Sequence, residues 1–68
     1  MQYCTGDLIQ VLETEFCYIL SEQFGTVQIP NIEIFGSIGI INEIINNEYE
    51  LLINNELIYV VSPNLRRL

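Results

Sequence analysis

The second half of the chain alternates between apolar runs and pairs of asparagines. Asn46-Asn47 and Asn54-Asn55 each separate two runs rich in Ile, Leu, Val and Tyr. Asparagine tolerates the positive φ that two-residue hairpin turns require. The pattern therefore predicts a three-stranded antiparallel meander, with strands over residues 37–45, 48–53 and 56–61.

Two-residue turns also predict which residues of the meander share a side. They place Ile45 opposite Glu48 and Ile53 opposite Glu56, and counting outward assigns every other position. The side expected to face the core carries Ile40, Asn42, Ile44, Tyr49, Leu51, Ile53, Ile58 and Val60. The opposite side carries Ile41, Glu43, Ile45, Glu50, Leu52, Leu57, Tyr59 and Val61. Because this second side is amphipathic rather than polar, we expect it to contact more than water.

The first half of the chain is less regular. Residues 8–12 alternate as a first strand would, but residues 8–24 as a whole also fit a helix. Asp7 and Gln10 have the spacing of a capping box, and Gly25 suits a helix C-terminal cap. A strand is favoured instead by strands on both sides of this segment and by alternation at Phe16, Tyr18 and Leu20.

Glycine and proline mark the remaining boundaries. Residues 26–35 are expected to be extended, with an interruption at Pro30-Asn31. Gly36 and Gly39 predict a bend or bulge at the start of the meander. Pro63 ends the third meander strand, because proline cannot donate to a sheet, and residues 65–68 then suit a short closing strand.

Composition limits the chain to one domain, over residues 1–68, and predicts that it has a partner. Half of the residues are apolar, which is more than so small a domain can bury. We therefore expect a protein partner or an assembly of copies. The longest apolar run, residues 16–20, is far too short to span a bilayer, and the N-terminus lacks the pattern of a secretory signal. No membrane contact is expected, and the cytoplasm is the expected location.

Charge and missing side chains exclude several functions. The net charge is −7, and only Arg66 and Arg67 are basic. Nucleic-acid phosphates would be repelled, so direct binding to DNA or RNA is not expected. The sequence has no histidine and no lysine, so neither Cys4 nor Cys17 has an obvious activating base. We expect both cysteines to be reduced and partly buried, and we expect no enzymatic activity, cofactor or metal.

One group of residues stands out for binding. The predicted register puts Glu43 directly opposite Glu50, with Glu48 nearby, and it places Tyr59 opposite Glu50 on the next strand. Like charges in opposite positions are unfavourable by up to about 1 kcal/mol. Because apolar residues surround these glutamates, the arrangement predicts an acidic and aromatic patch for a cationic partner. If the turns are not two-residue loops, the glutamates would not lie opposite each other. The candidate partner-binding residues are Glu43, Glu48, Glu50, Leu52, Leu57 and Tyr59, with Arg66 and Arg67 of a neighbouring copy as possible cations.

Three segments together carry a resemblance to a known group. They are Gly6-Asp7-Leu8-Ile9-Gln10-Val11, Gly36-Ser37-Ile38-Gly39-Ile40-Ile41, and Leu57-Ile58-Tyr59-Val60-Val61-Ser62-Pro63-Asn64-Leu65. This arrangement resembles the small SH3-like barrels of uncharacterised bacteriophage proteins. The resemblance implies an all-β antiparallel barrel whose last strand lies beside the first, and it implies no catalytic residue. Residues 13–35 are longer and more apolar than a plain loop, which leaves room for an extra hairpin or a short helix.

The sequence thus predicts a non-enzymatic binding or assembly module. It would act as a phage or viral accessory protein through protein contacts, in the host cytoplasm or in the virion. Two alternatives remain open. One is an inhibitor that imitates DNA with its carboxylates and blocks a host nucleic-acid-binding protein. The other is a structural accessory protein of a capsid or tail.

Overall fold

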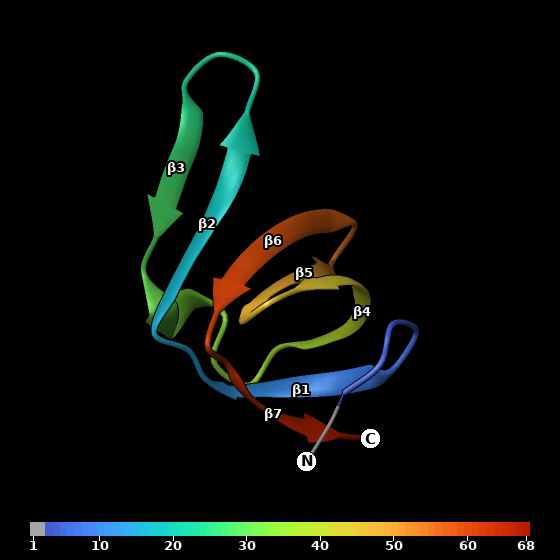
Figure 1. The fold of residues 1–68 in the computed structure, drawn as a ribbon. Helices are drawn as coiled ribbons and strands as arrows, with labels where there is room; N and C mark the ends of the chain where they lie inside the picture. The colour runs from blue at the N-terminus through green and yellow to red at the C-terminus, as the bar shows by residue number, and fades with distance from the viewer. Residues whose placement is uncertain (1–2) are drawn as a thin grey trace.

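The computed structural model describes residues 3–68, and in this range it contains seven strands and one short 3₁₀-helix (Figure 1). The elements are β1 (Leu8–Glu13), β2 (Phe16–Ser21), β3 (Gly25–Ile29), η1 (Asn31–Glu33), β4 (Ile38–Ile45), β5 (Glu48–Ile53), β6 (Glu56–Val61) and β7 (Asn64–Arg67). The segment that fitted both a strand and a helix forms the two strands β1 and β2. They are separated at Thr14 and Glu15.

All seven strands belong to one antiparallel sheet in the order β3-β2-β6-β5-β4-β1-β7. The predicted all-β architecture is therefore confirmed, and β7 lies beside β1 as expected. The sheet curls around its core without closing, because β3 and β7 stand at its two edges and do not pair with each other. The extra hairpin for which the sequence left room is β2–β3. The first half of β2 pairs with β6, and the loop end of the hairpin projects beyond the other strands (Figure 1).

The meander β4–β5–β6 has the predicted turns. Asn46, Asn54 and Asn55 have φ values of 57°, 51° and 66°, so asparagine supplies the left-handed backbone at both turns. Ile45 pairs with Glu48 and Ile53 pairs with Glu56. Both two-residue loops are confirmed, and so is the register that follows from them along β5–β6 and, in β4–β5, from the turn as far as the pair Glu43 and Glu50.

For the residues of β4 before Glu43, the prediction of which side chains face the core is wrong. Ile41 pairs with Leu51 and Glu43 pairs with Glu50, so Asn42 is an extra residue that forms a β-bulge. The bulge shifts the alternation by one position. Ile41, expected outside, is 1% exposed in the core, whereas Ile40, expected inside, is 43% exposed. Asn42 was also assigned to the core, but it is exposed, and its amide donates to the Glu50 carboxylate.

The core lies inside the curl of the sheet and is almost wholly aliphatic. Its buried members are Ile9, Val11, Cys17, Ile34, Ile41, Leu51, Ile53, Ile58, Val60 and Leu65. Gly39 is buried among them, and a Cβ there would lie 2.6 Å from both Ile53 Cγ1 and the Leu52 carbonyl oxygen. Gly39 is thus a site of close approach rather than a bend. The predicted bend is at Gly36, with a φ of +82°.

The residues after β3 differ from the prediction. Residues 26–35 were expected to be extended, but only the part within β3 is a strand, and η1 follows Pro30. Asn31 fixes this turn, because its Nδ2 donates to the Thr14 carbonyl at 3.0 Å. The Cys17 Sγ lies 3.2 Å from Asn31 Oδ1 and 3.3 Å from the Ile29 carbonyl oxygen. These bonds hold the base of the β2–β3 hairpin and end the strand at Ile29.

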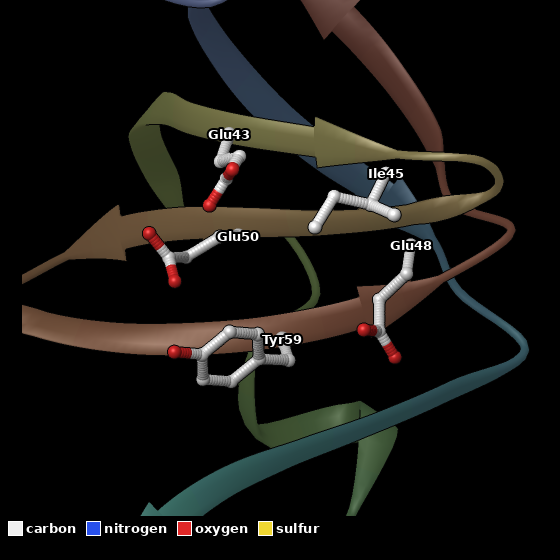
Figure 2. A pocket seen from close by; sticks show the side chains of 5 residues that line it. All are labelled: Glu43, Ile45, Glu48, Glu50 and Tyr59. Carbon is white, nitrogen blue, oxygen red and sulfur yellow. The ribbon is translucent and has the colours of Figure 1, made fainter.

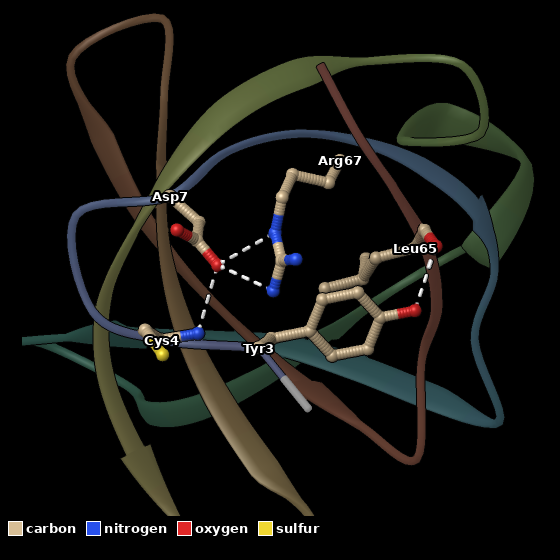
Figure 3. Close-up of polar contacts among 5 residues, drawn as sticks. All are labelled: Tyr3, Cys4, Asp7, Leu65 and Arg67. Atoms are coloured by element: carbon tan, nitrogen blue, oxygen red, sulfur yellow. Dashed lines mark hydrogen bonds and ion pairs between the residues drawn. The ribbon is translucent and has the colours of Figure 1, made fainter. Parts of the chain in front are cut away.

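The opposite end of the sheet is held by contacts between the two ends of the chain (Figure 3). Arg67 forms an ion pair with Asp7 at 3.1 Å, and its guanidinium lies over the Tyr3 ring. The Tyr3 hydroxyl donates to the Leu65 carbonyl at 2.7 Å. These contacts fix β7 against the start of the chain.

Candidate functional site

The outer side of the sheet, away from the core, carries a row of acidic and aromatic side chains. Glu43 pairs with Glu50, Glu50 with Tyr59, and Tyr59 with Tyr18, across β4, β5, β6 and β2. We call Glu43, Glu50, Tyr59 and Tyr18 the acidic row. The predicted pairing of Glu43 with Glu50 is therefore confirmed.

A second row, made only of aliphatic side chains, runs parallel to the first. Leu8 pairs with Ile40, Ile40 with Leu52, and Leu52 with Leu57, across β1, β4, β5 and β6. All four side chains are exposed. We call them the apolar row. Leu20 extends it onto β2, where it shares a shallow groove with Leu57.

The acidic row borders a small pocket at the centre of the meander. Its lining is Glu43, Ile45, Glu48, Glu50 and Tyr59 (Figure 2). Figure 2 shows the three carboxylates on the same side of β4 and β5, with the Tyr59 ring beneath them. The pocket is open, so these carboxylates remain accessible to a partner.

Two tyrosines lie beside these carboxylates, and one of them donates a hydrogen bond. The Tyr18 hydroxyl donates to Glu48 Oε1 at 2.8 Å, and this bond is the main reason that the pKa of Tyr18 rises to about 12. The neighbouring Glu50 carboxylate, followed by burial and other nearby negative charge, raises the pKa of Tyr59. Both phenols therefore stay protonated at neutral pH. The Tyr18 hydroxyl holds the Glu48 carboxylate in place without neutralising it.

The tyrosines also form an aromatic surface beside the acids. The rings of Tyr18 and Tyr59 stack with centroids 5.1 Å apart and planes 14° from parallel. Phe16 lies beyond Tyr18, with ring centroids 5.8 Å apart. A flat aromatic surface next to carboxylates suits a guanidinium or ammonium group, which gains from ring faces as well as from opposite charge.

The structure brings together six of the predicted partner-binding residues. Glu43, Glu48, Glu50, Leu52, Leu57 and Tyr59 all lie on the outer side of β4–β6. The two arginines lie elsewhere, on β7. Arg67 is bound to Asp7, and Arg66 donates to Gln10. A partner-binding role for these residues stays a prediction.

Sequence reasoning missed four contributors to this surface. Ile40 and Asn42 were assigned to the core because the bulge was not foreseen. Leu8 was not connected to the meander, since the pairing of β1 with β4 is a long-range contact. Tyr18 had a visible signal, its alternation with Phe16 and Leu20, but the partner strand β6 was unknown.

The other chemically relevant groups among the described residues are side chains of metal-ligating types and the cysteines. In residues 3–68, no group of three or more His, Cys, Asp or Glu side chains is arranged to hold a metal ion. Burial, with a smaller contribution from Glu33, raises the pKa of the Cys17 thiol, which stays protonated. Cys4 is exposed, so its expected partial burial was wrong. No helix in this range is long and apolar enough to cross a membrane.

Comparison with known proteins adds no relative. No protein-family model matches the chain, and neither the curated proteins nor the solved structures contain a significant match.

Proposed function

We propose that the protein is a non-enzymatic binding module whose outer side holds a segment of another protein. The observation that carries the proposal is the position of the acidic row directly beside the apolar row. A segment with cationic side chains on one flank and aliphatic side chains on the other would match both rows. The partner class is therefore a protein with a basic and apolar binding segment.

The two rows would contribute differently to binding. Burial of the apolar row supplies affinity at about 25 cal/mol per Å² of apolar surface removed from water. Glu43, Glu48 and Glu50 would select cationic groups and speed the encounter, since the net charge of −7 attracts basic proteins at a distance. Loss of either row should therefore weaken binding, but only the acidic contribution should be sensitive to salt.

The partner we propose is a different protein rather than another copy of the chain. The only basic side chains of the chain are Arg66 and Arg67, and both are engaged at the β1–β7 end. A neighbouring copy would have to break these contacts to reach the acidic row. A viral accessory role, in the host cytoplasm or as part of a capsid or tail, is supported by the resemblance to bacteriophage barrels and stays a prediction.

The DNA-mimic alternative draws its support from the three clustered carboxylates. The apolar row argues against it, because a phosphate backbone offers no aliphatic counterpart to Leu52 and Leu57. A mimic would lose its target steeply as salt rises, whereas the proposed module would retain part of its affinity through apolar burial.

Affinity capture with matched variants tests the proposal. The immobilised chain is compared with Glu43→Gln/Glu50→Gln, with Leu52→Ser/Leu57→Ser, and with the charge-matched control Glu13→Gln/Glu22→Gln. We expect a protein that is captured by the wild type and the control but lost with both outer-side variants. Its affinity is then measured at low and high salt. A captured protein that both outer-side variants retain would contradict the proposal.

A further inference from the structure

The edge strand β3 is an unguarded sheet edge. Among the described residues it pairs only with β2, so one edge of its backbone has no strand partner. Natural sheets protect such edges with charges, proline or covering segments. Within β3, the sequence Gly-Thr-Val-Gln-Ile contains none of the protective side chains.

The sequence on both sides of β3 is also free of charge. Residues 23–32 carry no charged side chain, and the sequence has no longer uncharged stretch. The two most exposed large apolar side chains in residues 3–68 flank this strand, namely Phe24 at 73% and Ile32 at 74%. An uncharged edge with an apolar residue at each end is unexpected in a chain with a net charge of −7.

The inner side of the hairpin is incompletely covered as well. Val27 and Ile29 are only half-buried. An open groove of about 310 Å³ lies between this hairpin and the strands of the core. Its lining is mainly isoleucine, with the polar side chains of Ser37 and Asn54 and the carboxylates of Glu33 and Glu56 among them. A strand added next to β3 would continue the sheet over this groove and cover part of it.

We propose that β3 is a dimerisation edge, at which β3 of a second copy pairs antiparallel about a twofold axis. Three observations select a second copy as the occupant. The edge is uncharged, so two strongly acidic molecules meet here with the least repulsion. A strand edge is complementary to another strand edge through its backbone groups. Antiparallel pairing also sets the Phe24 end of one β3 beside the Ile32 end of the other, which covers both exposed side chains in both copies.

The dimer is expected to be weak and closed. One pair of short strands buries less than the roughly 1,200 to 2,000 Å² of a standard interface, so the association should depend on protein concentration. A twofold axis uses the same edge on both copies and leaves no free β3 for a third. The outer side remains open in each copy, so dimerisation is independent of the proposed function.

Light scattering and sedimentation over a concentration series test the proposal. We expect the mass to rise from 7.9 kDa toward twice that value. Thr26→Lys/Gln28→Lys places lysines at exposed positions of the edge and should weaken the dimer by at least about tenfold. The matched control, Thr5→Lys/Asn64→Lys, adds the same charge at the β1–β7 end and should leave the dimer unchanged. Circular dichroism and thermal unfolding check that each variant is folded.

Crosslinking supplies a second measurement. In a Cys4→Ser background, Gln28→Cys should be joined to its counterpart by a short bismaleimide reagent, while Leu57→Cys on the outer side should not. A wild-type chain that stays monomeric at all concentrations would overturn the proposal. So would a dimer that survives Thr26→Lys/Gln28→Lys, one that the control also abolishes, or one that Gln28→Cys does not crosslink.

Two measurements, dimerisation and capture, separate this inference from the proposed function. Gln28 pairs with Tyr18 and Thr26 pairs with Leu20, so the edge variant alters the margin of both rows and does not serve as the control. The control is the wild type at a concentration where it is monomeric, which should still capture the outer-side partner. Glu43→Gln/Glu50→Gln should still dimerise. Capture by a chain that never dimerises would contradict only this inference, and a dimer that captures no partner would contradict only the proposed function.

Discussion

The two edges of the sheet are built in opposite ways. At one edge, β7 carries Arg66 and Arg67, buries Leu65 and is covered by Tyr3. At the other edge, β3 carries no charge and contributes no residue to the fully buried core. Figure 3 shows how Asp7 closes the β7 end by accepting bonds from Arg67 and from the Cys4 amide.

The difference in charge and covering between β7 and β3 distinguishes a protected edge strand from one that can pair with a further strand. Charged side chains and a covering ring, as at β7, discourage a further strand from adding to the sheet. An edge with none of these features, as at β3, is open to addition. The chain has only two basic residues, and both lie on β7. This distribution agrees with our inference that β3 is the edge that pairs between copies.

The largest expected effect compares one truncation at each edge. Leu65→Ala empties a buried site on β7 and should lower the free energy of unfolding by about 2–5 kcal/mol. Ile29→Ala on β3 removes a half-buried side chain and should cost clearly less. Chemical denaturation of both variants, at a concentration where the protein is monomeric, measures the difference. Equal losses would mean that both edges contribute alike to stability.

The second prediction concerns the base of the β2–β3 hairpin. Asn31→Ala leaves the Thr14 carbonyl without its Asn31 donor and removes one of the two polar contacts of the Cys17 thiol, at a cost of about 1–3 kcal/mol. We expect the hairpin to open locally rather than the whole chain to unfold. In a Cys4→Ser background, modification of Cys17 by a thiol reagent should therefore become faster, by about tenfold for each 1.4 kcal/mol.

The same experiment has an internal control. Leu65→Ala acts at the other edge, so at equal overall stability it should accelerate Cys17 modification less than Asn31→Ala does. If the two variants expose Cys17 equally, the hairpin and the β1–β7 end open together. The two edges of the sheet would then not differ in how easily they open.

The third prediction concerns the ion pair at the β7 edge. Asp7 and Arg67 are both partly exposed, so Asp7→Asn should cost less than about 1 kcal/mol, with a smaller loss at high salt. A double-mutant cycle with Arg67→Gln measures the coupling between the two side chains. A coupling energy that does not respond to salt would show that the contact acts through packing instead of charge.

The smallest expected effect is a change in the pKa of Tyr18, which lies on β2 of the hairpin. The bond to Glu48 raises the pKa of Tyr18 from 10.0 to about 12. A raised pKa means that the protonated phenol stabilises the fold below pH 10, and that this contribution disappears as the pH rises through about 12. Glu48→Gln should lower the pKa of Tyr18, which ultraviolet absorbance of tyrosinate detects. An unchanged titration would show that the bond does not persist in solution.

The parts of the fold that the sequence predicted are those with local signals. Each asparagine pair lies within one hairpin, so the turns, the register and the opposition of Glu43 and Glu50 followed from a few neighbouring residues. The first strand and the closing strand were visible for the same reason, through alternation and through Pro63. Local backbone preferences decide these features before any long-range contact forms.

The parts that escaped depend on contacts between distant residues. The stacking of Tyr18 on Tyr59 requires β2 to pair with β6, and the apolar row requires β1 to pair with β4. The bulge at Asn42 lets Ile41 enter the core, and no local pattern distinguishes Ile41 from Ile40. The contacts of Arg67 join the two ends of the chain, so a sequence alone could not show that this cation was engaged.

The extra residue at Asn42 reverses the alternation of inward and outward side chains along β4. Before it, odd-numbered positions of β4 point inward, and after it the assignment is reversed. Deletion of this single amino acid would force Ile40 and Ile41 to exchange places or the strand to slide along its neighbours. Which isoleucines of β4 reach the outer side therefore depends on one inserted residue. An insertion or deletion at this position would change that part of the exposed surface without replacing any of its other side chains.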